Sequence, residues 1–142
     1  MPTNISWKLN VEIQSGPSVI VTNTVQPNAY DRIEVKVPHS TAPSPPPTTV
    51  DVQPGAAGKV ELLLIRSTRY GKDDKELVYK VHNDTTPQRA LNDAVFLVGA
   101  GNLKLLEQTD PTKPATPLDK LLVTNTTGQD VVLEIIVGRS AT

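Results

Sequence analysis

Hydrophobic and polar residues alternate along the first part of the chain. From Ile5 to Ile13 every second residue is apolar, and the residues between them are polar or charged. The same alternation returns from Ile33 to Val37, and the segment from Val19 to Val25 is rich in valine and threonine. Because successive side chains of a β-strand point to opposite faces, all three segments are predicted strands, and the two alternating ones should each bury one face.

Other segments are apolar at consecutive positions. The clearest is the run from Val60 to Ile65, in which only Glu61 is polar and which would place apolar side chains on both faces of a strand. Four shorter runs share this feature: Val95–Val98, Leu121–Val123, Val131–Leu133 and Ile135–Val137. A sheet with one face in water does not need that pattern. The second face must therefore be covered by a second layer, a long loop or another subunit.

Turn-forming residues divide the chain into about ten short strands, and few segments are candidates for helices. A length of 142 residues fits one compact domain. The chain is therefore predicted to be an all-β protein, with one antiparallel β-sandwich domain over residues 1–142. The long connection described below favours a jelly-roll or other Greek-key arrangement.

Two long hairpins are predicted from neighbouring strand signals. The first runs from Lys59 to His82, and the second joins Lys120–Asn125 to Asp130–Val137.

The segment from Thr86 to Gly99 is ambiguous, because its apolar residues fit helical spacing while its last residues are typical of a strand. We favour a turn or helical start followed by a strand from Ala94 to Val98. Another strand is predicted from Leu103 to Gln108.

A proline-rich stretch from Pro38 to Thr49 is the one break in composition. Proline has no backbone donor, so this segment cannot be a central strand. We interpret it as an extended surface loop that crosses the sandwich. The alternative is a ligand for a groove that recognises proline-rich segments.

Composition excludes several classes of protein. There is no cysteine, which rules out disulfides and thiolate metal sites. Lysine and arginine total 14, aspartate and glutamate total 15, and the formal net charge is -1. These charges are spread along the chain, so no basic patch favours nucleic acid or an anionic membrane surface.

The expected location follows from the absence of targeting signals in the sequence. The first residues lack the basic and apolar regions of a secretory signal, and no apolar stretch approaches the roughly 20 residues of a membrane span. The default expectation is a cytoplasmic protein, or one released as part of a particle.

Catalytic and metal-binding motifs are scarce. The two histidines, His39 and His82, are both expected to face solvent, and neither accompanies a nucleophile motif. The adjacent Asp73 and Asp74 are flanked by lysines, which favours a solvated loop over a metal site. No catalytic residue, metal site or cofactor is therefore predicted, and the chain is expected not to be an enzyme.

Aromatic residues suggest one weak binding platform. Tyr70 follows Arg69 in a polar loop and is the aromatic residue expected to be most exposed. Tyr30 begins a strand, and Trp7 is in phase with an apolar row that predicts core or interface. Exposed aromatic faces can stack on sugar rings, so Arg69 and Tyr70 are the candidate ligand platform.

Two function classes remain. The first is a non-catalytic structural or interaction subunit that self-assembles through strand faces, as a homo-oligomer or within a larger particle. Its candidate interface residues are Leu122, Val132 and Ile136, which should lie on the outer face of the last two strands. The alternative is a β-sandwich module that binds carbohydrate or another small ligand.

Overall fold

Antiparallel strands make up most of the computed structural model, which describes residues 3–52, 59–82, 86–106, 112 and 118–140. Within these ranges there are ten strands, one short α-helix and one 3-10 turn. They are β1 (Ile5–Glu12), β2 (Ser18–Val25), β3 (Ala29–Val37), β4 (Thr48–Asp51), β5 (Lys59–Ser67), β6 (Leu77–Val81), β7 (Arg89–Ala90), β8 (Val95–Val98), α1 (Ala100–Leu103), the 3-10 turn Lys104–Leu106, β9 (Lys120–Asn125) and β10 (Val131–Ser140).

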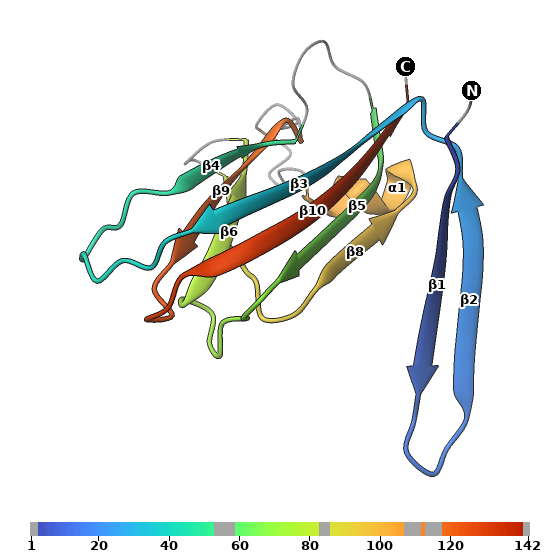
Figure 1. Cartoon of the computed structure of the whole chain (residues 1–142), viewed down its shortest axis with the longest axis horizontal. Coiled ribbons are helices and arrows are strands. Elements are labelled where there is room, and N and C mark those ends of the chain that lie inside the picture. The colour runs from blue at the N-terminus through green and yellow to red at the C-terminus, as the bar shows by residue number, and fades with distance from the viewer. Residues whose placement is uncertain (1–2, 53–58, 83–85, 107–111, 113–117, 141–142) are drawn as a thin grey trace.

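Eight of these strands form two four-stranded sheets. The first sheet has the order β3-β10-β5-β8 and the second has the order β4-β9-β6-β7. The antiparallel pairs are nested along the chain: β3 pairs with β10, β4 with β9, β5 with β8 and β6 with β7. This nesting is a long hairpin wound into two layers, which is the jelly-roll arrangement (Figure 1). The prediction of an all-β antiparallel sandwich is confirmed.

Both predicted hairpins are wrong in their pairing. β5 lies in the first sheet and β6 in the second, and β9 and β10 are divided in the same way. Their connections cross from one layer to the other. The alternation of residues identifies a strand but carries no information about its partner, and in a wound hairpin the partners are distant in sequence.

The prediction of a strand from Leu103 to Gln108 is also wrong for residues 103–106. The segment begins with the end of α1 and the 3-10 turn, which bury Leu103 and Leu106. These leucines are three residues apart, and that spacing puts them on one side of a helical turn. Residues 107 and 108 lie outside the described part of the chain. No helix precedes β8 in residues 86–94, where the two-residue strand β7 lies instead.

The core lies between the two sheets. Val131, Leu133, Ile135 and Val137 of β10 are almost fully buried and meet Leu121 and Val123 of β9 and the inward side chains of β5 and β6. The residues between them on β9 and β10 are half-buried and point outward. Each fully buried apolar side chain of this size contributes about 1.5–3 kcal/mol, so the alternation fixes which face of each strand enters the core.

One buried amide joins the end of the sandwich. The side chain of Asn125, at the end of β9, donates to the carbonyl oxygens of Val37 (3.1 Å) and Gln129 (2.8 Å). Its oxygen accepts hydrogen bonds from the backbone N–H (3.0 Å) and the hydroxyl (2.7 Å) of Thr127. Asn125 is 2% exposed. It therefore links both sheets to the turn before β10.

Replacing Asn125 by aspartate should destabilise the fold. A carboxylate cannot donate, so Asn125→Asp would bring a buried charge against two carbonyl oxygens. We expect a loss of about 2–4 kcal/mol in the free energy of unfolding, measured by urea denaturation. An unchanged midpoint would show that the amide is not a structural link.

Candidate functional site

The hairpin formed by β1 and β2 projects from the sandwich as a separate two-stranded sheet, called the arm here (Figure 1). Its register opposes Trp7 to Asn23, Leu9 to Val21 and Val11 to Val19. Opposed residues of an antiparallel pair share a face, so these side chains line one face, together with Ile5 and Val25 at its base. The other face carries Ser6, Lys8, Asn10, Glu12, Ser18, Ile20, Thr22 and Thr24.

Exposed apolar side chains are concentrated on the arm. Eight large hydrophobic residues of the described part are exposed, and six of them belong to the arm: Leu9, Val11, Ile13, Val19, Ile20 and Val21. The prediction that the segment from Ile5 to Ile13 buries its apolar face is therefore wrong beyond Trp7. Alternation shows that one face is apolar, but it does not show what covers that face.

The base of the arm packs on the outer face of the first sheet. The ring of Trp7 meets that of Phe96 on β8 edge to face, with 5.3 Å between their centroids. The Cδ1 atom of Ile5 lies 3.3 Å from the position that a Cβ would take on Gly138, with Pro27 and Leu62 close by. Glycine at this point of β10, beside a register shift, leaves room for the arm to sit directly on the strand.

A larger side chain at Gly138 should lift the base of the arm. A Cβ at position 138 would already be 3.3 Å from Ile5, and the branched side chain of Gly138→Val would crowd Ile5 further. We therefore expect Trp7 to become more exposed and its fluorescence emission to shift to the red. Trp7 is the one tryptophan of the chain, which makes the signal specific. The matched control is Gly101→Val, because a Cβ on Gly101 meets nothing within 4 Å. Equal emission spectra for both variants would contradict the packing of the base of the arm against Gly138.

The three predicted interface residues are all half-buried and point outward, but the structure does not bring them together. Leu122 lies on β9, on the outer face of the second sheet, while Val132 and Ile136 lie on β10, on the outer face of the first. They are therefore on opposite sides of the sandwich. Their role in an interface stays a prediction.

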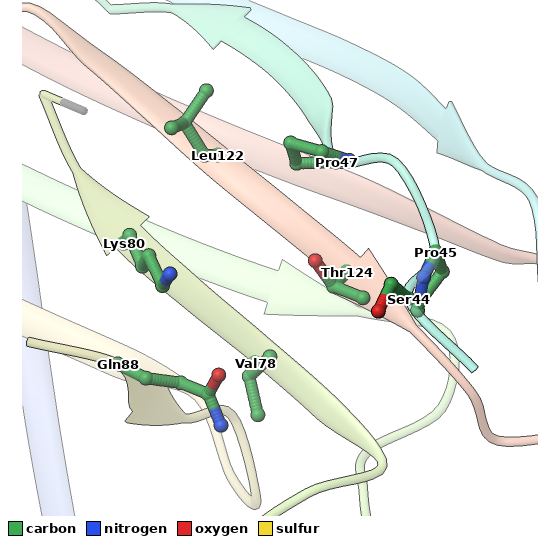
Figure 2. Close-up of a pocket in the computed structure, with 8 residues that line it drawn as sticks. All are labelled: Ser44, Pro45, Pro47, Val78, Lys80, Gln88, Leu122 and Thr124. Carbon is green, nitrogen blue, oxygen red and sulfur yellow. The ribbon is translucent and has the colours of Figure 1, made fainter. Parts of the chain in front are cut away.

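The proline-rich segment covers part of the outer face of the second sheet. Residues 38–47 have no regular structure, are mostly exposed and link β3 in one sheet to β4 in the other. A cavity of about 300 Å³ lies beneath this segment, and Figure 2 shows the side chains that line it. It is lined by Ser44, Pro45 and Pro47 of the segment and by Val78, Lys80, Gln88, Leu122 and Thr124. Leu122 thus has partial cover within its own chain.

Three charged residues on the outer face of the first sheet, Arg32, Arg66 and Glu134, form one group. Glu134 on β10 accepts hydrogen bonds from Arg32 on β3 and forms an ion pair with Arg66 on β5, whose nearest nitrogen is 2.8 Å away. The hydrogen bond from Arg32 lowers the pKa of Glu134 below its usual range. A depression of about 510 Å³ beside this group includes Val132. The apolar surface around Val132 and Ile136 is therefore interrupted by charge.

The predicted ligand platform is not an exposed aromatic face. Tyr70 is half-buried and packs against the core, and its hydroxyl oxygen accepts a hydrogen bond from the backbone N–H of Ser67 (3.3 Å). Arg69 donates to the side-chain oxygen of Gln129 at 2.9 Å. The expectation that Tyr70 is the most exposed aromatic residue is wrong, because Tyr30 is 54% exposed.

Each histidine has a carboxylate neighbour. The Nδ1 atom of His82 lies 2.9 Å from a carboxylate oxygen of Asp119, and both side chains are about one-third exposed. His82 also has a positive φ of 73°, which non-glycine residues rarely adopt. The pair can hold the imidazole in one orientation, and the absence of catalysis stays a prediction.

His39, at the start of the proline-rich segment, contacts Asp130. The carboxylate of Asp130 accepts hydrogen bonds from the backbone N–H of His39 (3.0 Å), lies 3.1 Å from its Nδ1 and forms an ion pair with Lys36 at 3.1 Å. The hydrogen bonds from His39, followed by the contact with Lys36, hold the pKa of Asp130 well below its usual range. This group attaches the start of the proline-rich segment to the turn before β10.

Asp130→Asn should lower the melting temperature near neutral pH and lose this effect in acid. A depressed pKa means that the folded state favours the charged carboxylate, so the stabilisation is present above the unfolded pKa of about 4. It is lost as the pH falls through the lower folded value. Thermal melts from pH 7 to pH 2 should show the gap between wild type and variant narrowing in acid. Asp74→Asn, at an exposed position, is the control; a gap independent of pH would contradict the charge argument.

Among the described residues, no group of three or more histidine, aspartate or glutamate side chains could hold a metal ion. No helix in the same part of the chain has the length and apolar character to cross a membrane. Comparisons of the chain with protein-family models, curated proteins and solved structures found no match. Any proposal for its function rests on the residues of the chain itself.

Proposed function

We propose that this protein is a non-catalytic structural subunit that self-assembles through the faces of its β-strands, as a homo-oligomer or as part of a larger particle. The observation that carries the proposal is the arm, where six exposed large hydrophobic side chains lie on one projecting hairpin. Contiguous exposed apolar surface on a soluble protein usually marks an interaction site.

The arm is poorly stabilised without a partner. A two-stranded hairpin in water is marginally stable, and further strands or packing against another element are needed to hold it. The base of the arm has such packing at Ile5 and Trp7, but Leu9 and Val11 are 46% and 48% exposed. Covering a half-exposed side chain of this size contributes roughly 1 kcal/mol, so an assembly that covers the face gains stability from each one.

The outer faces of the two sheets are weaker candidates for the main contact. On the first sheet, Val132 and Ile136 lie near the ion pairs of Glu134 with Arg32 and Arg66. On the second, Leu122 lines a cavity that the proline-rich segment partly encloses. We propose that these residues extend the interface rather than begin it.

A module that binds carbohydrate or another small ligand is the second candidate. The observation in its favour is the cavity beneath the proline-rich segment, where Ser44, Gln88 and Thr124 offer polar groups next to Leu122 and Val78. A thermal-shift screen with sugars separates the two candidates: a stabilising sugar whose effect is lost when Thr124→Trp fills the cavity supports ligand binding.

Self-assembly predicts a solution mass above the 15.3 kDa of one chain, measured by light scattering at micromolar concentration. Leu9→Lys places a charge on the apolar face and should return the mass to that of one chain. Asn10→Lys, on the opposite face of the same strand and opposed to the uncharged Ile20, should leave it unchanged. A wild-type protein that stays monomeric at every concentration would contradict the proposal.

A further inference from the structure

The apolar face of the arm carries no charged side chain. Both charged residues of the hairpin, Lys8 and Glu12, lie on the opposite face, where Lys8 is opposed to Thr22 and Glu12 to Ser18. Beyond Trp7 the apolar face consists of Leu9, Val11, Ile13, Val19 and Val21, with Asn23 beside Trp7. A surface without charge is matched by another surface without charge, because a charge buried against it would lose its hydration.

A second copy of the chain offers few surfaces of that kind. Across its first sheet the outer face presents Arg32, Glu34, Arg66 and Glu134. The second sheet has the proline-rich segment over part of its outer face. The two exposed large hydrophobic residues that lie off the arm, Tyr30 and Leu105, are on separate elements, β3 and the 3-10 turn. Among the described residues, the one extended, uncharged and exposed apolar surface is the arm.

We infer that the arms of two copies pack face to face, each covering the apolar face of the other. This inference rests on the proposed function and names the contact that begins assembly. The same patch meets itself across a two-fold axis, which gives a closed, isologous contact. Two hairpins stacked in this way form a small four-stranded sandwich with layers about 10 Å apart.

The contact should be of modest strength. Five side chains on each arm, between 43% and 57% exposed, become covered. This is small beside standard interfaces, which bury roughly 1,200–2,000 Å². We therefore expect reversible pairing, with an average mass that rises with concentration through the micromolar range.

Neighbouring residues with equal exposure provide a matched test. Val19 is 55% exposed and Ile20 is 56% exposed, and they point to opposite faces of β2. Val19→Lys should raise the concentration needed for pairing at least tenfold, while Ile20→Lys should change it less than twofold. Neither residue contacts the core between the sheets, so the melting temperature of the body serves as a check of folding. Equal effects of the two variants on pairing would overturn the inference, because they would place the contact at a strand edge.

Cysteine cross-linking tests whether arm meets arm. The natural chain has no cysteine, so a single introduced one can form a disulfide only between copies. Cysteines on the apolar face that lie nearest the two-fold axis should form disulfide-linked dimers under mild oxidation, faster than Thr22→Cys on the other face. The variants to compare are Leu9→Cys, Val11→Cys, Val19→Cys and Val21→Cys. If Val19→Lys disrupts assembly but no face position cross-links faster than Thr22→Cys, the arm docks elsewhere on the second copy; the inference then fails and the proposed function stands. A monomeric wild type overturns both.

Discussion

The central strand β10 is the constraint on which the rest of the structure depends. It pairs with β3 on one side and β5 on the other, so most of its backbone is committed to the first sheet. Its inward residues, including Leu133 and Ile135, form the middle of the core. On its outer face, Gly138 provides the close approach that seats Ile5 at the base of the arm. One strand thus fixes both the sandwich and the point from which the arm projects.

The body and the arm differ in how their apolar residues are covered. In the body, two sheets cover each other, and the nested pairing of strands leaves the inward faces dry. In the arm, cover ends after Trp7, which meets Phe96 at the edge of the first sheet. A jelly roll already satisfies its own core, so exposed apolar residues on an appended hairpin have no role in folding the body. In the proposed assembly, contact with another copy gives them a role.

Much of the fold could be predicted from sequence, because period-two patterns identify strands reliably where one face enters a core. The outward orientation of Leu122, Val132 and Ile136 follows from the same parity, and the structure places them so. The strand partners could not be predicted, since β9 and β10 are neighbours in sequence yet belong to different sheets. The arm was missed for a related reason: the alternation from Ile5 to Ile13 is the same whether the apolar face meets a core or solvent. The one available signal was the turn at Ser15 and Gly16, which joins two strands into a hairpin, but nothing in its residues showed that the hairpin would stand apart.

Hydrogen–deuterium exchange at several protein concentrations tests the central claim most directly. The backbone amides of β1 and β2 should become better protected as concentration rises, because pairing of the arms stabilises a hairpin that is marginal alone. The amides of β10 should keep the same protection throughout, since the body folds within one chain. Protection of the arm that does not depend on concentration, with a mass of one chain across the same range, would contradict the account.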